Sequence, residues 1–152
     1  MALKLTSSAF SEGKTIPRQF TCDEKDVSPP LTIESPPPNT KTFALICDDP
    51  DAPRGTWVHW VLFNIPADKR ELPEDLPAQE TLPDGTKQGR NDFGNIGYGG
   101  PCPPGGTHRY FFKLYALDME LALEPGSSKS QLLDSMKGHI VAETQLMGTY
   151  KR

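Results

Sequence analysis

Proline and glycine are the feature of this sequence that most restricts its fold. The 152 residues include 16 Pro and 13 Gly, which together make up about a fifth of the chain. Proline interrupts helix interiors and central sheet ladders, so it concentrates in turns and at strand edges. Hydrophobic residues still make up 36% of the chain and recur along most of its length, which is enough for a core. The sequence therefore predicts short strands joined by many turns.

Several segments have the pattern of strands. Residues 42–48 form a continuous apolar run, residues 56–66 are rich in aromatic and β-branched side chains, and residues 108–117 alternate in polarity. Residues 1–41 predict an opening strand followed by turn-rich coil, and residues 140–150 predict a last strand. The expected architecture is mainly β.

One helix is expected late in the chain. Ser127 or Ser128 is suited to cap it, Gly138 to end it, and Leu132, Leu133 and Met136 to supply its apolar face. Residues 67–97 lack apolar periodicity and predict a long loop, of the kind that is functional or mobile in compact domains. Without an internal repeat or a composition break, residues 1–152 are interpreted as a single domain.

Charge and cysteine content exclude some classes of function. A net charge of −4 argues against nucleic-acid binding, which needs clustered cationic charge, and no segment approaches the roughly 20 apolar residues of a membrane span. Cys22, Cys47 and Cys102 are odd in number and contain no C-x-x-C pair, so we expect neither a disulfide framework nor a structural zinc site. A start without the apolar core of a secretory signal adds to the expectation of a cytoplasmic protein.

Two of the predicted strands carry a histidine near their start, and a carboxylate follows a third strand. Because side chains two residues apart share a face of a strand, His59 is expected beside Trp57, and His108 beside Tyr110. Asp49 comes directly after the first apolar run. If these strands are neighbours, two imidazoles and one carboxylate meet at the same rim of the sheet.

The same alternation predicts which side chains share each face of these strands. In the strand at residues 56–66, one face is expected to carry Trp57, His59, Val61 and Phe63, opposite Val58, Trp60 and Leu62. In the strand at residues 108–117, one face is expected to carry His108, Tyr110, Phe112 and Leu114, opposite Arg109, Phe111, Lys113 and Tyr115. His139, beside the helix end, is interpreted as a partner of the helix dipole.

Two long motif blocks carry a resemblance that this periodicity does not show. The first block is Asp49-Pro50-Asp51-Ala52-Pro53 followed by His59-Trp60. The second is Gly97-Tyr98 with Gly100-Pro101-Cys102-Pro103-Pro104 and His108-Arg109-Tyr110. Together they resemble the signature of the phosphatidylethanolamine-binding protein family. Ser28-Pro29-Pro30-Leu31 and the ending Gly148-Thr149-Tyr150-Lys151-Arg152 resemble its short prokaryotic branch, often labelled Raf-kinase-inhibitor-like.

The resemblance implies a fold and a site. It implies an antiparallel β-sandwich with Greek-key connections, and a non-catalytic pocket without a cofactor that takes phosphate, phosphoethanolamine or a similar anion. The residues implied to line this pocket or to form its walls are Asp49, Pro53, Trp57, His59, Gly100, Pro101, His108 and Tyr110. Asp51 and Arg109 are expected to be structural and paired with each other. The short prokaryotic relatives are often dimers, so the resemblance also implies a homodimer.

The chemistry of such a pocket follows from its side chains. Two imidazoles that titrate near pH 6.5 supply N–H donors and, as cations, hold an anion by charge-assisted hydrogen bonds. Asp49 is expected to accept a hydrogen bond from one imidazole, which fixes its tautomer. The alternative is that Asp49 accepts one from a ligand ammonium.

Three other functions are compatible with the same residues. Asp49, His59 and His108 form a two-histidine, one-carboxylate set of the kind that binds transition metals. Hydrolysis is a second alternative, with Cys102 as a candidate nucleophile, although the sequence has no G-x-S-x-G motif. The third is inhibition of serine proteases or kinases, with the loop at residues 67–97 or the proline-rich turns as the recognition segment.

Overall fold

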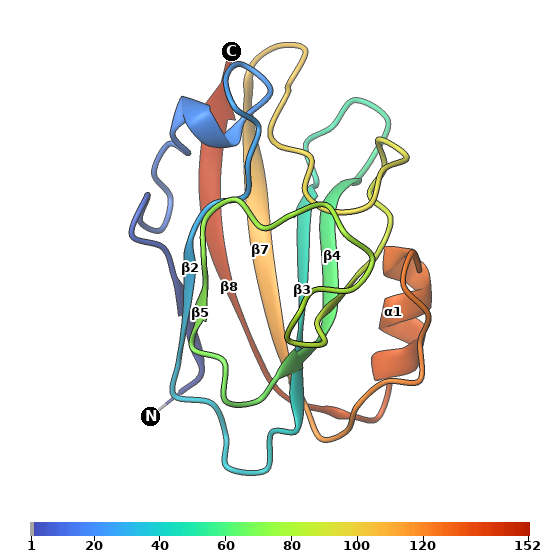
Figure 1. Cartoon of the computed structure of the whole chain (residues 1–152). Helices are drawn as coiled ribbons and strands as arrows, with labels where there is room; N and C mark the ends of the chain where they lie inside the picture. The colour runs from blue at the N-terminus through green and yellow to red at the C-terminus, as the bar shows by residue number, and fades with distance from the viewer. Residues whose placement is uncertain (1) are drawn as a thin grey trace.

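The computed structural model describes residues 2–152 as two antiparallel sheets and one α-helix. A five-stranded sheet lies between a three-stranded sheet on one side and helix α1 (Lys129–Met136) on the other (Figure 1). The prediction of a mainly β sandwich with one short helix is confirmed. In the part of the chain that is described, no helix has the length and apolar content needed to span a membrane.

The strands have mostly the predicted positions. The large sheet contains β3 (Thr42–Asp49), β4 (Trp57–Pro66), β6 (Lys87–Gln88), β7 (Thr107–Leu117) and β8 (Ile140–Lys151). The small sheet contains β1 (Lys4–Thr6), β2 (Leu31–Glu34) and β5 (Glu71–Leu72). A short 3-10 helix, η1 (Arg18–Phe20), precedes β2. The long loop at residues 67–97 is confirmed apart from the two-residue strands β5 and β6.

The order of the large sheet is β6-β4-β3-β7-β8. Strand β7 passes β6 and β4 to pair with β3, so β3, β4, β6 and β7 have the spatial order of a Greek key. This order has one consequence for the site. The end of β3 and the starts of β4 and β7 lie side by side at one end of the sandwich, although they are far apart in sequence.

Two hydrophobic clusters cover the two faces of the large sheet. The cluster toward the small sheet includes Trp60, Tyr110 and Phe112, all at most 1% exposed. The cluster under α1 includes Leu132 and Met136, which pack with side chains of β3 and β4. The faces predicted for β7 are confirmed, because His108, Tyr110, Phe112 and Leu114 all lie on the small-sheet side and are buried.

The predicted helix begins with a capping box. The Ser128 hydroxyl accepts from the Gln131 backbone N–H, and the Gln131 side chain accepts from the Ser128 backbone N–H. Ser128 is therefore the N-cap, rather than Ser127. Gly138 follows the helix with a φ of 81°, a left-handed conformation that glycine adopts without strain.

The predicted faces of β4 are wrong beyond His59 because the strand contains a bulge. Asp48 of β3 pairs with Val58 and Cys47 pairs with Trp60, so His59 is an extra residue. A bulge places two consecutive side chains on one side of a strand and shifts the alternation that follows. As a result Val58 packs with Val61 and Phe63 under the helix, and the His59 ring lies against Tyr110, on the small-sheet side.

Candidate functional site

A pocket of about 200 Å³ opens where β3 ends and where β4 and β7 begin. This is the end of the sandwich at which the C-terminus lies (Figure 1). Its lining residues are Asp49, Ala52, Pro53, Trp57, His59, Phe93, Cys102, Pro103, Pro104, His108 and Tyr110. The structure thus brings together six of the eight residues predicted for the site.

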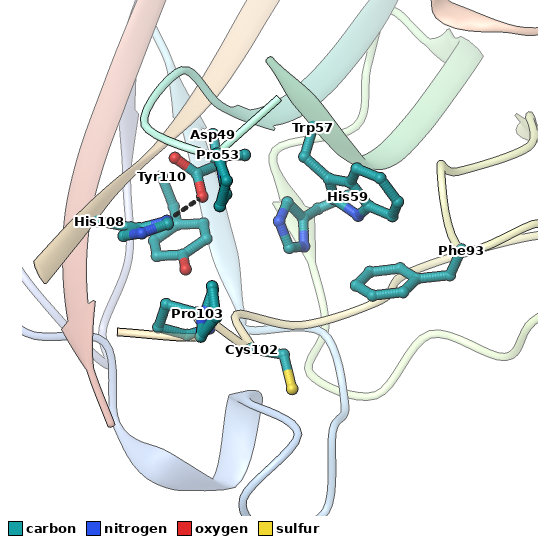
Figure 2. A pocket seen from close by; sticks show the side chains of 11 residues that line it. Asp49, Pro53, Trp57, His59, Phe93, Cys102, Pro103, His108 and Tyr110 are labelled. Carbon is teal, nitrogen blue, oxygen red and sulfur yellow. Dashed lines mark hydrogen bonds and ion pairs between the residues drawn. The ribbon is translucent and has the colours of Figure 1, made fainter. Parts of the chain in front are cut away.

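Asp49 and His108 form a buried pair at one side of the pocket (Figure 2). His108 Nδ1 lies 2.6 Å from Asp49 Oδ2. With a carboxylate as the acceptor, the proton of this hydrogen bond is on Nδ1, so the tautomer of the ring is fixed and Nε2 is the nitrogen left for a ligand. The expectation that Asp49 orients one imidazole is confirmed.

The other oxygen of Asp49 is used within the turn that follows β3. Asp49 Oδ1 accepts from the backbone N–H of Asp51 at 2.7 Å. Asp51 in turn accepts two hydrogen bonds from the Arg109 guanidinium, at 2.9 and 2.8 Å, and this contact lowers the pKa of Asp51 to about 2. The predicted pairing of Asp51 with Arg109 is confirmed. Since both oxygens of Asp49 are engaged, the role of ammonium acceptor is not needed to satisfy it.

The bulge in β4 directs His59 into the pocket. Its Nδ1 lies 2.5 Å from the carbonyl oxygen of Gly99, and a carbonyl only accepts, so Nδ1 carries a proton. The ring contacts Tyr110 and Phe93 edge to face, at centroid distances of 5.2 and 5.4 Å. Burial lowers the pKa of His59, against the opposing effect of the Gly99 hydrogen bond. The prediction that both imidazoles titrate near pH 6.5 is therefore wrong for His59, because the ring is only 3% exposed.

Tyr110 contributes a hydroxyl to the same pocket. The residue is 1% exposed, and within residues 2–152 its hydroxyl has no hydrogen-bond partner. Burial, followed by the negative charge of Asp49, raises the pKa of Tyr110. The hydroxyl therefore keeps its proton at neutral pH and is available as a donor.

Phe93 is the pocket residue that sequence reasoning missed. It comes from the long loop between β6 and β7 and lies against both Trp57 and His59. The sequence offered one signal, because Phe93 is the only aromatic residue in the segment 67–97. Periodicity gives no direction for a side chain in a loop, so this signal did not place it at the site.

Gly100 and Pro101 do not line the pocket, although they were predicted as its walls. The Gly100 N–H donates to Asp26 Oδ1 at 2.7 Å, and the Pro101 carbonyl accepts from the Cys22 N–H at 3.1 Å. A Cβ on Gly100 would collide with the carbonyl oxygen of Phe20. The two residues therefore dock the turn before Cys102 onto the segment after η1.

The prediction that the cysteines form no disulfide is wrong. Cys22 and Cys102 are joined by a disulfide across a sequence separation of 80 residues, and Cys47 is free and buried. The disulfide ties the wall of the pocket at Cys102 to the segment after η1. It also removes Cys102 as a nucleophile, since a disulfide sulfur carries no thiolate. The argument for a reducing compartment from the cysteine count fails with it.

The metal alternative has no geometric support within residues 2–152. No group of three His, Cys, Asp or Glu side chains there is arranged to hold a metal ion. Asp49 is bonded to His108 Nδ1, and His59 Nδ1 is bonded to a backbone carbonyl. The three side chains are thus arranged around a pocket instead of converging on one point.

The fold and the pocket define a class of protein: a β-sandwich with a small, mostly aromatic and proline-lined cavity at one end, suited to binding a small molecule. A family model described as phosphatidylethanolamine-binding protein matches residues 6–151. The chain belongs to the phosphatidylethanolamine-binding protein family, and the resemblance seen in the sequence motifs is confirmed. Membership supports a role as a binding protein.

Individual relatives of the chain are similar to it in sequence over nearly its full length. It is 53% identical over 150 residues to a UPF0098 protein of Methanothermobacter thermautotrophicus, with 99% of each chain covered. It is 50% identical to a UPF0098 protein of Aquifex aeolicus, covering 99% of this chain and 89% of that protein.

Two solved structures share the fold. One is a phosphatidylethanolamine-binding protein homologue from Chlamydia trachomatis, with a TM-score of 0.92, 42% identity and coverage of 99% of this chain and 98% of that one. The other is YbcL of E. coli, described as a new member of the mammalian family, with a TM-score of 0.91, 34% identity and coverage of 100% and 99%.

Proposed function

We propose that this chain is a non-catalytic binding protein whose pocket takes phosphate, phosphoethanolamine or a similar small phosphorylated anion. One observation carries the proposal: two buried imidazoles and an unpartnered tyrosine hydroxyl line the same cavity, and each imidazole has its Nδ1 engaged by an acceptor of the protein. The groups left for a ligand are thus Nε2 of His59, Nε2 of His108 and the Tyr110 hydroxyl.

Each group has a defined part in holding an anion. The Tyr110 hydroxyl donates to a phosphate oxygen. His108 donates from Nε2 when the ring is protonated, and Asp49, 2.6 Å from Nδ1, balances the positive charge that results. No Lys or Arg lines the pocket within the described chain, so these donors supply the recognition.

His59 couples binding to protons. Its lowered pKa keeps the ring neutral near pH 7, with a lone pair on Nε2. An anion therefore binds with uptake of a proton by His59, or binds as a protonated phosphate whose O–H donates to Nε2. Both routes make binding tighter as the pH falls below neutrality, the first because His59 takes up a proton and the second because the phosphate does.

Binding without catalysis is supported by the lining of the pocket. Its side chains include no Ser, Thr or Lys, and its cysteine is in the disulfide. A covalent mechanism through a serine, threonine, lysine or cysteine nucleophile thus has no such side chain among these residues, and both oxygens of Asp49 already accept hydrogen bonds. Incubation with phosphate esters and acyl esters is expected to give no product above the background rate, and turnover that His108→Ala abolishes would contradict the proposal.

The binding site is tested by calorimetry with inorganic phosphate and with phosphoethanolamine at pH 6. His59→Ala and His108→Ala are each expected to weaken binding by more than tenfold. The matched control is His139→Ala, because His139 is the third histidine of the chain and pairs with Asp118 outside the pocket. Unchanged affinity in both pocket variants would reject the site.

Three further predictions from the sequence stay predictions. Inhibition of serine proteases or kinases, homodimer formation and a cytoplasmic location have no observation among the described residues that favours them. The inhibitor role is tested by assays against a panel of serine proteases and kinases, and the dimer by light scattering.

A further inference from the structure

Two aromatic side chains stand at the mouth of the pocket and are not explained by anion binding. Trp57 is 37% exposed and Phe93 is 44% exposed, and they are two of the four large hydrophobic side chains that are exposed in residues 2–152. Figure 2 shows them beside each other, on the side of His59 away from the Asp49–His108 pair. Their ring centroids are 5.5 Å apart, with planes at 73°.

The position of Phe93 is fixed by its own turn. The Asn91 side chain accepts from the backbone N–H of Phe93 at 3.0 Å and from that of Asn95 at 3.1 Å, and it donates to the Gly97 carbonyl at 2.9 Å. Asn91 itself is only 3% exposed. The exposed Phe93 ring therefore belongs to a turn that the buried Asn91 side chain holds in place.

A second contact ties this turn to the start of β4. Asp92 Oδ2 accepts from the backbone N–H of Val58 at 2.7 Å, so Phe93 is held at a set distance from Trp57. The Phe93 ring also covers Gly99, where a Cβ would lie 2.5 Å from the ring. Because the two rings are already ordered, little conformational entropy is lost when a ligand packs against them.

The size of the cavity points the same way. Its volume of about 200 Å³ is more than one phosphate group occupies. A phosphate held by His59, His108 and Tyr110 would leave the rings of Trp57 and Phe93 in water. A ligand with an apolar substituent beyond the phosphate would cover them.

We propose that Trp57 and Phe93 form an aromatic subsite that takes a flat apolar substituent of a phosphate monoester, so that the site prefers an aryl phosphate to inorganic phosphate. This inference rests on the proposed function and names its ligand class. Aromatic rings pack edge to face or offset against one another, and the open faces at the mouth suit such a guest. Each oxygen of Asp49 already accepts one hydrogen bond, so an ammonium group would share these acceptors with His108 and Asp51.

The test compares phenyl phosphate with inorganic phosphate by calorimetry on the full chain. Phenyl phosphate is expected to bind at least tenfold more tightly. Phe93→Ala is expected to remove most of this preference, measured as the ratio of the two affinities in the same variant. Met119→Ala is the matched control, because Met119 is 37% exposed and does not line the pocket.

A second variant, Phe93→Leu, controls for a loss of folding in Phe93→Ala. Phe93→Leu keeps an apolar side chain but loses the ring, so it is expected to retain part of the preference, and a thermal melt of both variants checks that they are folded. Folded Phe93 variants that retain the full preference for phenyl phosphate would overturn the proposal. Trp57→Phe, which keeps a ring, is expected to retain most of the preference.

Further ligands distinguish which kind of substituent the subsite takes. Tighter binding of phosphocholine or phosphoethanolamine than of phenyl phosphate would overturn the proposal in favour of a cation subsite. Binding to phosphatidic acid vesicles without a preference for phenyl phosphate would overturn it in favour of a lipid. If wild type binds phosphate and phenyl phosphate equally, only the subsite fails. If it binds neither, the proposed function itself fails.

Discussion

The Nδ1 atom of His108 lies 2.6 Å from Oδ2 of Asp49, and both side chains are buried, at 7% and 3% exposure. The two residues are 59 positions apart in the chain. They meet because β7 pairs antiparallel with β3, with Phe111 opposite Asp48, so the start of β7 reaches the end of β3. The pair therefore results from the topology of the sheet, and its hydrogen bond fixes the tautomer of His108.

Asp49→Asn is expected to lower the affinity for phosphate by at least tenfold while the protein stays folded. The amide has nearly the same shape as the carboxylate, but it cannot balance a protonated His108. A hydrogen bond to a charged group contributes about 1.5–3 kcal/mol, which corresponds to about tenfold or more in affinity.

Calorimetry with phosphate at pH 6 measures the effect of Asp49→Asn, and the chain offers a matched control. Asp118 pairs with His139 at 3.0 Å, and the two side chains are 42% and 40% exposed. Asp118→Asn thus changes an Asp–His pair outside the pocket and is expected to leave the affinity unchanged. Wild-type affinity in folded Asp49→Asn would show that the carboxylate has no part in anion binding.

His59 gives the stability of the fold a dependence on pH. Burial lowers the pKa of His59 in the folded state, whereas in the unfolded chain it titrates near 6.5. As the pH falls below about 6.5, the unfolded state takes up this proton first, so the folded state loses stability until the lowered pKa is reached. Above about pH 6.5 the contribution of His59 to stability is fully present.

The slope within this window is at most about 1.4 kcal/mol per pH unit, the value for a full one-proton difference between the unfolded and folded states. It is measured as the difference in unfolding free energy between wild type and His59→Gln, by urea denaturation at pH values from about 7 downward. The difference isolates His59 from the carboxylates that titrate at lower pH. The control variant His139→Gln is expected to show the same pH dependence of the unfolding free energy as wild type. If His59→Gln also shows the pH dependence of wild type, His59 is not the group responsible.

The sequence was sufficient for the strands, because they depend on local patterns, and the resemblance of its motifs to a known family implied the cluster of polar residues. The apolar run at residues 42–48 and the alternation of residues 108–117 are visible in the sequence, and both strands formed there. The motif resemblance then placed Asp49, His59 and His108 in one pocket. The strands require no knowledge of how distant segments pack, whereas the pocket depends on the pairing of β3 with β4 and β7.

The orientation of His59 was not predictable from alternation. A bulge depends on how β4 pairs with β3, and the extra residue between Val58 and Trp60 has no marker such as glycine. The position of Phe93 was not predictable either, since hydrogen bonds to the Asn91 side chain determine the conformation of its turn. Both cases arise from contacts that form only after the chain has folded.

The disulfide was missed for a related reason. An odd number of cysteines without a C-x-x-C pair suggested free thiols, but pairing depends on distance in space. Cys22 and Cys102 come together because the turn after Gly100 docks on the segment after η1, through Gly100 N–H to Asp26 and Cys22 N–H to Pro101. The third cysteine, Cys47, lies in the core strand β3 and is buried.

This disulfide is expected to stabilise the fold and to hold one wall of the pocket. A disulfide restricts the unfolded chain and typically contributes about 2–4 kcal/mol, with more for long loops. Replacing both cysteines, Cys22→Ser with Cys102→Ser, is therefore expected to lower the free energy of unfolding by about that amount, as measured by denaturant titration. Cys47→Ala is not a suitable control, because Cys47 is a core residue and its truncation leaves a cavity.

The reduced wild type provides the matched control for the double variant. A thiol reductant should lower the stability of wild type toward that of the variant and should leave the variant itself unchanged, because only wild type has the bond to lose. Phosphate affinity should fall less than in His108→Ala, since Cys102 contributes a wall and no donor to the pocket. If wild type and the double variant unfold at the same denaturant concentration without reductant, the Cys22–Cys102 bond does not contribute to the stability of the folded protein.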